Sequence, residues 1–322
     1  MLKLSCHISI GERLQPFDFC TEIEVRSSYR NLTDTATITL PRQIRFEQDN
    51  IYLPDVELKD VVKPGDSVSI ALGYDNELIE EFTGFVRAVH AELPIVIECE
   101  DAMYRLKRIT VSKSWRSIQL RDMLREIVPT DIEIKTVDMQ LGKFRIAKAT
   151  VARVLSELRE RYGLFSFFRN GVLHVGFAYS FAERNEHRYH FERNIVSSSL
   201  EYRERDHEPV EVRAISILSD NSRVEVTVGE PGGSSTTMHQ YNIDDEETLR
   251  KLAEEFLERI NTPRYQGTFT AFGSPSVQQG DIVDLQSSHY PDRQGRYLVE
   301  EVITTWGQSG FRRRIKPERY VG

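Results

Sequence analysis

The chain has 322 residues, of which 39% are hydrophobic and 29% charged, a composition typical of a globular protein with two or three domains. It contains no uninterrupted apolar run long enough to cross a bilayer, and its first residues lack the apolar core of a signal peptide. The formal net charge of −8 disfavours general binding to nucleic acid, which depends on Lys and Arg. We therefore expect synthesis in a cytoplasm and no membrane insertion.

The charge is unevenly spread along the chain. Residues 1–100 carry 9 Lys and Arg against 18 Asp and Glu, and residues 177–322 carry 18 against 24. Residues 101–176 are basic instead, with 15 Lys and Arg against 8 Asp and Glu. The middle of the sequence therefore differs in character from the two acidic parts that flank it.

The first hundred residues predict β-strands, because polar and apolar side chains alternate with the period of a half-buried strand. The segments expected to form strands are Glu22–Arg26, Thr35–Leu40, Ser67–Leu72, Phe82–Val89 and Ile95–Cys99. A long charged stretch between Pro41 and Val61 interrupts them. Irregular stretches of this length inside a compact domain are typically functional or disordered.

The basic middle part predicts a small α+β region. Apolar residues recur there with helical spacing in two segments, and a third segment alternates around a dipeptide suited to a type I′ turn. The expected elements are a helix over Leu120–Val128 capped by Ser117, a helix over Thr150–Tyr162 ended by Gly163, and a hairpin over Phe165–Val175 that turns at Asn170 and Gly171.

The last third returns to strands, with one helix among them. Asp244–Ile260 is the clearest amphipathic helix in the chain, and Asp244 with Glu247 resembles a capping box at its start. The expected strands are Val210–Leu218, Arg223–Val228, Thr236–Ile243, Gln266–Phe272, Asp281–Gln286, Tyr297–Trp306 and Phe311–Ile315.

A weak internal repeat links the first and last thirds. The pattern V-x-x-G-D-x-V-x-[IL] occurs at Val62–Ile70 and again at Val277–Leu285. Its glycine suits a tight turn with positive φ, and its aspartate can bond nearby backbone groups. A second glycine follows each copy. The predicted turn residues are Gly65, Asp66 and Gly84 in the first copy and Gly280, Asp281 and Gly295 in the second.

The repeat predicts a β-rich α+β fold in which two related β-barrels flank the α+β insert. The expected boundaries are 1–100 for the first barrel, 101–193 for the insert and 194–322 for the second barrel with its amphipathic helix. We expect the two repeated turns to occupy equivalent positions in the two barrels.

With this order of motifs, the chain resembles the central baseplate hub proteins of contractile-tailed phages, of the Mu-like tail protein and late-control protein D type. The same hub fold forms the N-terminal part of type VI secretion spike proteins. The stretches that carry the resemblance are Val62–Ile70, Phe82–Val86 leading to Glu98–Leu106, Val151–Gly176, and the C-terminal series Gly280–Val283, Gly295–Val299 and Gly310–Arg313.

The resemblance implies a structural protein of the tail baseplate in a virion, assembled in the host cytoplasm. Such hubs are homotrimers in which six tube-like barrels form a pseudo-sixfold ring that matches a hexameric tail tube. The opposite face seats a spike, and other baseplate proteins surround the ring. Because the chain ends at Gly322, soon after the second barrel, we expect a separate spike protein. A phage, a tailocin and another injection machine remain alternatives as the parent particle.

The sequence also suggests where subunits meet. The candidate elements are the Pro41–Val61 stretch, the helix Asp244–Ile260 and the basic run near the C-terminus, where Arg312 and Arg314 share one strand face. The candidate contact residues are Pro41, Ile44, Phe46, Ile51, Leu249, Phe256, Arg312 and Arg314. We further expect the acidic barrels to line a channel through which DNA passes without specific binding, with the basic insert outside the ring.

The sequence favours a protein that is not an enzyme. It contains no P-loop, no G-x-G-x-x-G and no G-x-S-x-G motif, and the resemblance offers no catalytic residues to carry over. His187 and His190 lack a third ligand of convincing spacing, so no metal or other cofactor is expected. Cys6, Cys20 and Cys99 do not form a disulfide framework and are expected to be small buried or half-buried side chains. A tail-associated enzyme that cleaves peptidoglycan and a nucleic-acid-binding module remain the rival functions.

Overall fold

The structure is a computed structural model. It describes residues 3–12, 16–41, 46–48, 51–53, 61–90, 94–177, 184–204, 209–218, 220, 222–261 and 263–321, with backbone alone at 46–48, 51–53, 259 and 319. None of the helices in these ranges is both long and apolar enough to span a bilayer.

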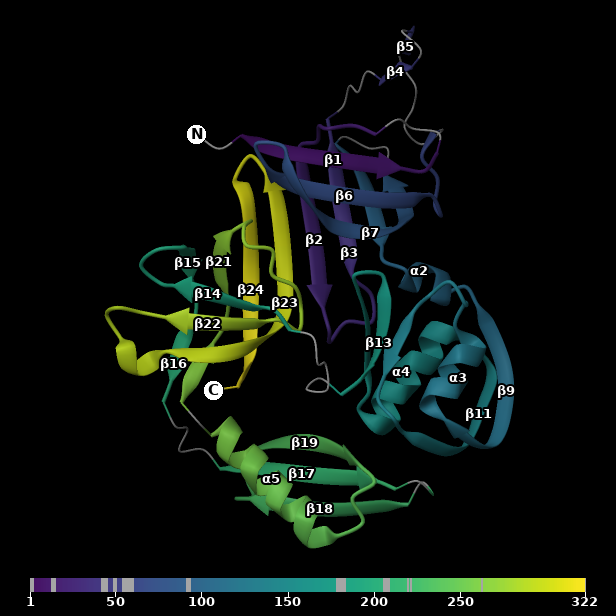
Figure 1. Ribbon diagram of the computed structural model, residues 1–322, viewed down its shortest axis with the longest axis vertical. Coiled ribbons are helices and arrows are strands. Elements are labelled where there is room, and N and C mark those ends of the chain that lie inside the picture. The colour runs from purple at the N-terminus through teal and green to yellow at the C-terminus, as the bar shows by residue number, and fades with distance from the viewer. Residues whose placement is uncertain are drawn as a thin grey trace.

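A bent twelve-stranded sheet forms the centre of the molecule (Figure 1). Its first half-sheet has the order β1-β6-β7-β8-β3-β2, and all neighbours in it are antiparallel. These strands are β1 (Leu4–Ile10), β2 (Glu22–Ser28), β3 (Thr35–Leu40), β6 (Ser67–Tyr74), β7 (Glu77–His90) and β8 (Ile95–Glu100). Their side chains alternate between buried and exposed positions, as the sequence predicts.

The second half-sheet continues from β2 through β23, β24, β21 and β15, and β22 with β14 branches from it. These strands are β14 (Glu186–His190), β15 (Ile195–Ser198), β21 (Phe269–Phe272), β22 (Ile282–Gln286), β23 (Gly295–Gly307) and β24 (Gly310–Tyr320). The long strand β23 serves both halves, because residues 301–307 pair with β2 and residues 295–298 pair with β22.

Each half-sheet has its own apolar core, but the C-terminal hairpin contributes to both. Trp306 and Phe311, at the tip of β23 and β24, pack in the core of the first half-sheet. Val302 and Ile315, further along the same two strands, pack in the core of the second. The sequence predicted residues 1–100 as the whole of the first barrel. The corresponding half-sheet in fact also uses residues of the C-terminal hairpin in its core.

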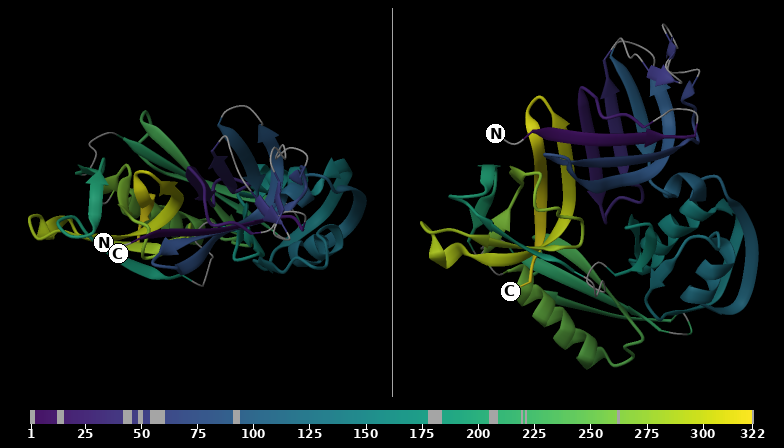
Figure 2. Two further views of the ribbon diagram at one scale, coloured as in Figure 1. Left: turned by 90° about the horizontal axis from the view of Figure 1, so that it is seen from above. Right: turned by 45° about the horizontal axis from the view of Figure 1, so that its top comes forward.

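The insert forms a separate lobe beside the first half-sheet (Figures 1 and 2). Its three helices and its strands surround one large apolar core. The elements are α2 (Met103–Leu106), β9 (Thr110–Gln119), α3 (Leu120–Ile127), β10 (Ile134–Thr136), β11 (Gln140–Thr150), α4 (Val151–Tyr162), β12 (Phe165–Arg169) and β13 (Val172–Gly176). Gly163 ends α4 in the left-handed conformation, as predicted, and Thr150, expected as the start of the helix, is its N-cap.

A third lobe, which we call the helix–sheet unit, comprises residues 209–261. It consists of β17 (Val210–Ile217), β18 (Arg223–Gly229), β19 (Ser234–Tyr241) and α5 (Glu246–Ile260), in the strand order β18-β17-β19. Helix α5 packs on this small sheet with a core of its own. The short strands β16 (Glu201–Arg203) and β20 (Arg264–Gln266) pair where the chain enters and leaves the unit.

Several sequence predictions need correction. The described strands form an open sheet rather than two closed barrels, because β1 lies at one end of the strand order and does not pair with β2. Strand β14 lies within the range predicted for the insert, yet it pairs with β22 in the second half-sheet. The predicted second barrel also contains the helix–sheet unit, whose helix packs on its own three strands rather than on the large sheet.

Two predicted helix caps are also wrong by a few residues. Ser117 lies within β9, and Gln119 occupies the N-cap of α3. At α5, the carboxylate of Asp245, not Asp244, accepts hydrogen bonds from the backbone N–H and hydroxyl of Thr248. In both segments several polar residues could serve as the cap, and tertiary packing selects one of them.

Candidate functional site

The two repeated turns make the same hydrogen bonds. Gly65 N–H donates to the Val86 carbonyl at 2.8 Å, and Gly280 N–H donates to the Val299 carbonyl at 2.9 Å. Each turn is closed by its aspartate, whose carboxylate accepts from the backbone N–H three residues earlier, at Lys63 or Gln278. Both glycines have positive φ, 99° and 84°. The turns therefore lead into β6 and β22 in the same way, each antiparallel to the next long strand.

The later glycines of the two copies are not equivalent. Gly84 faces Val68, whereas Gly295 faces Leu285, two residues further along the corresponding strand. A Cβ at Gly84 would lie 2.1 Å from the Glu100 carbonyl oxygen, so this glycine permits the close approach of β8. At Gly295 a Cβ would meet the ring of Tyr320 instead. The two glycines thus permit close packing against different neighbours, the backbone of β8 at Gly84 and the Tyr320 ring at Gly295.

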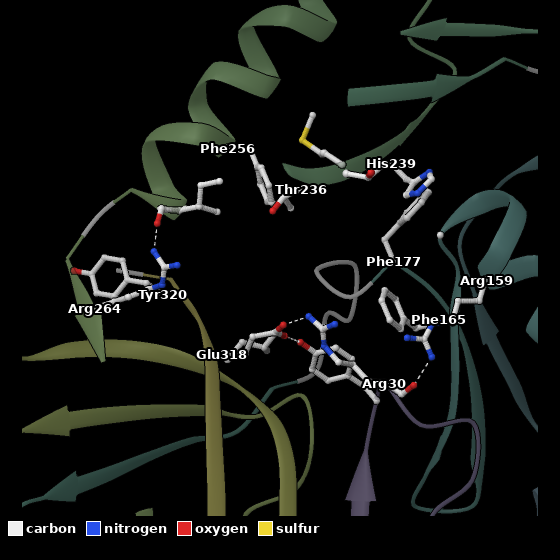
Figure 3. A pocket seen from close by; sticks show the side chains of 16 residues that line it. Arg30, Arg159, Phe165, Phe177, Thr236, His239, Phe256, Arg264, Glu318 and Tyr320 are labelled. Atoms are coloured by element: carbon white, nitrogen blue, oxygen red, sulfur yellow. Dashed lines mark hydrogen bonds and ion pairs between the residues drawn. The ribbon is translucent and has the colours of Figure 1, made fainter. Parts of the chain in front are cut away.

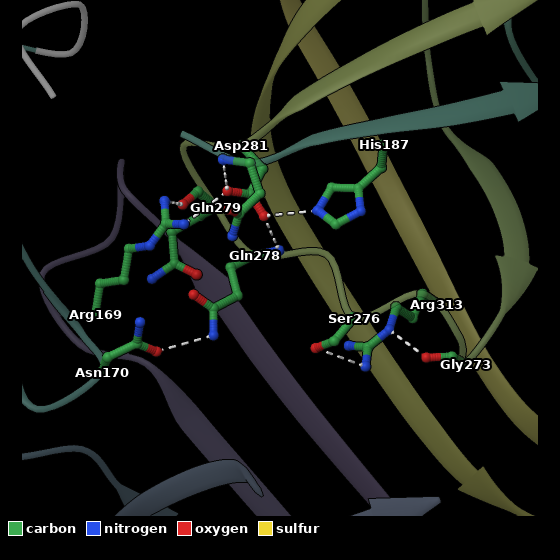
Figure 4. A network of polar contacts seen from close by, with 10 residues as sticks. Arg169, Asn170, His187, Gly273, Ser276, Gln278, Gln279, Asp281 and Arg313 are labelled. Carbon is green, nitrogen blue, oxygen red and sulfur yellow. Dashed lines mark hydrogen bonds and ion pairs between the residues drawn. The ribbon is translucent and has the colours of Figure 1, made fainter. Parts of the chain in front are cut away.

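The second repeated turn carries a buried polar network (Figure 4). The Asp281 carboxylate is fully buried and accepts from the Arg169 guanidinium at 2.6 Å, while His187 Nε2 lies 3.3 Å away. Burial raises the pKa of Asp281, but the contacts with His187, the Gln278 N–H and Arg169 outweigh it, and the pKa lies below its ordinary value. The equivalent Asp66 is half-buried.

A second buried pair of carboxyl groups lies next to this turn. The Asp34 carboxyl accepts from the Gln279 side-chain amide at 2.9 Å, and Asp34 N–H donates to the Asp101 carboxyl at 3.0 Å. Gln279 also donates to the Phe168 carbonyl in the insert hairpin. Burial raises the pKa of Asp34 to about 7, and burial together with the Asp34 charge raises the pKa of Asp101 well above its ordinary value.

These residues tie together the three parts of the chain that meet here. We call Asp34, Asp101, Arg169, Gln279 and Asp281 the polar joint. Asp34 follows β2 in the first half-sheet, Asp101 begins the insert, Arg169 ends β12 of the insert, and the last two belong to the second repeated turn. The joint therefore fixes how the insert sits against both half-sheets.

A buried ion pair links the two half-sheets at a second point. Arg313 of β24 is 1% exposed, and its guanidinium contacts both carboxylate oxygens of Glu81 in β7. It also donates to the Gly273 carbonyl at 2.7 Å and the Thr304 hydroxyl at 2.9 Å. Neighbours from both half-sheets thus accept hydrogen bonds from this buried guanidinium, which offsets the cost of burying its charge.

An open groove of about 500 Å³ lies where the insert, the helix–sheet unit and the large sheet meet (Figure 3). Its lining is largely apolar and includes three arginines and one carboxylate. Arg30 pairs with Glu318, and Arg159 donates to the Arg30 carbonyl. The lining residues are Tyr29, Arg30, Arg159, Gly163, Phe165, Phe177, Thr236, Thr237, Met238, His239, Phe256, Ile260, Arg264, Leu298, Glu318 and Tyr320.

The groove has the chemistry of a surface for an apolar segment that carries negative charge. Burial, followed by the nearby Arg223 charge, lowers the pKa of His239, so this side chain adds no positive charge at neutral pH. Arg30, Arg159 and Arg264 outnumber the single carboxylate Glu318, in a chain whose net charge is −8. Short-range contacts with these guanidinium groups would therefore favour acidic groups on a ligand.

The predicted contact residues are scattered. Pro41 is exposed at the end of β3. Phe46 and Ile51 begin β4 (Phe46–Gln48) and β5 (Ile51–Leu53), which among the described strands pair only with each other. Ile44 lies outside the described residues. Leu249 is fully buried against the strands of its own unit, so its selection as a subunit contact was wrong.

The remaining predicted contacts lie on the surface. Phe256 is half-buried and lines the groove. Arg314 is exposed, and the half-buried Arg312 has its guanidinium 4.9 Å from the centre of the Phe272 ring. The sequence missed Arg313, although strand alternation places it on the same face as the buried Phe311 and Ile315.

One cluster resembles the order of a hydrolase triad. Ser288 Oγ lies 3.2 Å from His190 Nε2, and His190 Nδ1 lies 2.7 Å from Glu192 Oε2. His190 Nδ1 nevertheless makes no hydrogen bond within the described part of the chain. The N–H of His289, which follows the serine, donates to Ser287 Oγ and is not presented to an oxyanion. The cluster is better explained as a brace between two surface turns.

The whole chain matches solved structures of tail proteins. A tail protein from Neisseria meningitidis aligns over 98% of this chain and 96% of its own, with a TM-score of 0.65 and 14% identity. The 43 kDa tail protein of prophage MuSo2 from Shewanella oneidensis aligns over 98% and 96%, with a TM-score of 0.63 and 12% identity. An Escherichia coli component of the type VI secretion system aligns over 98% and 77%, with a TM-score of 0.59 and 11% identity.

The chain has the fold of these tail proteins. The predicted resemblance to phage baseplate hubs and type VI spike proteins is thereby confirmed at the level of the fold. No protein-family model and no curated protein matches the sequence. The similarity is therefore seen in the arrangement of the strands and lobes. The sequences themselves share only 11–14% identity with these three proteins.

Proposed function

We propose that this protein is the structural hub of a phage-type tail baseplate. In this proposal three copies form a ring with pseudo-sixfold symmetry that joins a hexameric tail tube to the central spike. The observation that carries it is the match of nearly the entire chain, all lobes included, to tail proteins. The repeated turn and strand, used once in each half-sheet, supports it further, because two similar halves in each of three subunits give six similar positions.

The polar joint and the Arg313–Glu81 pair suit this role. A hub that mates with a symmetric tube must hold its two halves at a fixed angle, and these buried contacts couple the halves and the insert directly. The groove, with Phe256 in its wall, is the surface we assign to a neighbouring tail protein. The acidic first and last thirds would line the channel and repel the phosphates of passing DNA, and the basic insert would lie outside.

The test is the mass and symmetry of the assembled protein. We expect light scattering of the purified chain, alone or with its tube and spike partners, to show three times the chain mass of 37.3 kDa. Cryo-electron microscopy of the parent particle should place threefold density of this fold between tube and spike. Monomers in every mixture, together with a particle that lacks such density, would refute the proposal. A lumen lined mainly by Lys and Arg would refute the charge arrangement alone.

A hub of a type VI-like injection machine is the second candidate, favoured by the match to a type VI secretion component. The parent particle distinguishes the two, since only a phage contains DNA. Peptidoglycan cleavage is the alternative of a different class. A cell-wall release assay with the purified protein and its Ser288→Ala variant tests it, and turnover that disappears in the variant would establish an enzyme.

A further inference from the structure

The two carboxyl groups of the polar joint are buried side by side. Asp34 is 7% exposed and Asp101 is 5% exposed. Asp34 N–H donates to the Asp101 carboxyl, and Asp101 N–H donates to the Asp34 carbonyl, each at 3.0 Å. Neither carboxyl forms an ion pair with a described residue. Lys107, whose charge acts on Asp101, is paired with Glu100 at 2.9 Å. Two ionised carboxylates at this place would therefore repel each other without a cation to offset them.

The remaining hydrogen bonds to these carboxyls come from different parts of the chain. The Asp34 carboxyl accepts from Ser28 N–H at 3.1 Å, at the end of β2, and from the Gln279 side chain in the second repeated turn. The Asp101 carboxyl accepts from Met103 N–H at 2.9 Å, where α2 of the insert begins. The charge on this pair therefore acts on the contact between the first half-sheet, the insert and the second half-sheet.

A hollow of about 110 Å³ is lined both by the carboxyl pair and by the Arg313–Glu81 ion pair. The two arginines in its wall are already engaged, Arg313 with Glu81 and Arg169 with Asp281. Asp281 also contacts His187. Because the hollow is polar and large enough to admit water, water rather than a cation of the chain would hydrate an ionised joint. The charged residues that line it are Asp34, Glu80, Glu81, Asp101, Arg169 and Arg313.

We propose that the polar joint is a latch held closed by protons on the Asp34–Asp101 pair, which opens more readily as the two carboxyls ionise. In the closed joint, burial raises the pKa of Asp34 to about 7. Burial and the Asp34 charge raise the pKa of Asp101 well above its ordinary value. Once the joint opens, water reaches both carboxyls, and each ionises near the ordinary value of 3.8. Opening therefore releases protons, so the closing contribution is complete below about pH 4 and is lost as the pH rises to about 7.

The experiment measures hydrogen exchange of the full-length protein by mass spectrometry, for the natural chain and for Asp34→Asn at each pH. Comparison at equal pH cancels the intrinsic pH dependence of exchange. In peptides that contain Ser28 or Met103, the ratio of natural to variant exchange rates should rise by up to about tenfold per pH unit from about pH 4 to 7. The ratio should stay constant in peptides of α5, which packs on its own small sheet. Asp66→Asn, at the equivalent and half-buried aspartate of the first repeated turn, is the matched control and should follow the natural chain at every pH.

A rate ratio that does not change with pH would overturn the proposal, as would the same change in Asp66→Asn. A change of equal size in every peptide would assign the protons to the stability of the whole fold rather than to a latch. Carbon-13 chemical shifts of the carboxyl groups need no substitution, and they would refute the latch if Asp34 and Asp101 were both ionised at about pH 5. The inference does not depend on a trimer or on a tail partner, so failure of the proposed function would leave it standing.

Discussion

Arg313 illustrates how a single buried charge can join two halves of a molecule. It lies in the middle of a run of three arginines, yet only the central one faces the core, where it is 1% exposed and meets Glu81. The desolvation of such a pair is offset only while both partners and their additional hydrogen bonds are present. Its energetic value is therefore best measured by removing one partner at a time.

We expect Arg313→Met to lower the free energy of unfolding by about 3–5 kcal/mol, because Glu81 is left buried without its cation. Chemical denaturation followed by circular dichroism measures the change. Arg314→Met, one residue away and exposed, is the control and should change stability by less than about 0.5 kcal/mol. Adding Glu81→Gln to Arg313→Met should recover part of the loss. Equal effects of the two single arginine variants would contradict the buried-pair interpretation.

The paired carboxyl groups of the polar joint predict a pH dependence with a definite sign. The folded-state pKa of Asp34, about 7, lies above the ordinary value of 3.8, so the folded protein holds a proton that the unfolded chain has lost. This contribution to stability is complete below the unfolded pKa and is lost as the pH rises through the folded pKa. Asp101, whose pKa is also raised, contributes in the same direction.

We therefore expect Asp34→Asn, which mimics the neutral acid, to gain stability relative to the natural chain as the pH rises from about 4 to 7. Each pH unit in this window is worth up to about 1.4 kcal/mol for one group. Melting temperatures of both proteins across this range measure the difference. A difference that stays constant, or that shrinks toward neutral pH, would show that Asp34 is ionised in the folded protein.

At the scale of elements, the two repeated turns offer a matched comparison. Gly65 and Gly280 both have positive φ, and a Cβ at either would meet its nearest neighbour at an ordinary distance of 3.5 or 3.4 Å. Gly65→Ala and Gly280→Ala should therefore each cost about 1–2 kcal/mol, through backbone strain alone. Equilibrium unfolding of the two variants tests this. A much larger loss at only one site would indicate that the turns are not equivalent.

The repeat could be predicted from sequence because each turn depends on local residues, a glycine that permits positive φ and an aspartate that closes the loop. The joining of the two half-sheets into one open sheet could not be predicted, since the strand that completes the first half-sheet comes from residues 301–307. No local pattern specifies that pairing. The polar joint could not be predicted for the same reason. Asp34 and Gln279 lie 245 positions apart, and the residues near each of them give no indication of the other.

Within the insert, local signals were sufficient for some elements and misleading for others. Thr150 and Gly163 mark the ends of α4 unambiguously, and Asn170 with Gly171 sets the hairpin turn, both with positive φ. Ser117 has the side chain of a helix cap, but the long pairing of β9 with β11 extends the strand past it. Tertiary pairing overrode a capping preference worth about 1 kcal/mol.

At the scale of the whole molecule, the helix–sheet unit forms one wall of the groove, and its contacts with the insert help to hold it in place. The Tyr241 hydroxyl accepts from Gln140 N–H at 2.6 Å, at the start of β11. Ile215 and Ile217 of the same unit pack into the core of the insert. These contacts place the groove-lining face of β19 opposite the insert and the large sheet.

We expect Tyr241→Phe to loosen this attachment by about 1 kcal/mol, because Gln140 N–H loses its acceptor. Hydrogen exchange should become faster in β17 and β19 while the rates in the large sheet stay unchanged. Tyr290→Phe, at a side chain that is 53% exposed, is the control. Uniformly faster exchange across the whole chain would show instead that the unit does not open separately.

The shared strand β23 has a consequence for how the protein is made. Trp306 and Phe311 complete the core around β1–β8, yet they are synthesised long after β8, which ends at Glu100. Until β23 and β24 have been synthesised, the core of the N-terminal strands lacks these two side chains, and the edge of β2 that pairs with β23 has no partner strand. A chain cut short before β23 would lack this closing hairpin and would expose that edge to proteases and chaperones. The core around β1–β8 is therefore completed only after the β23–β24 hairpin has been synthesised.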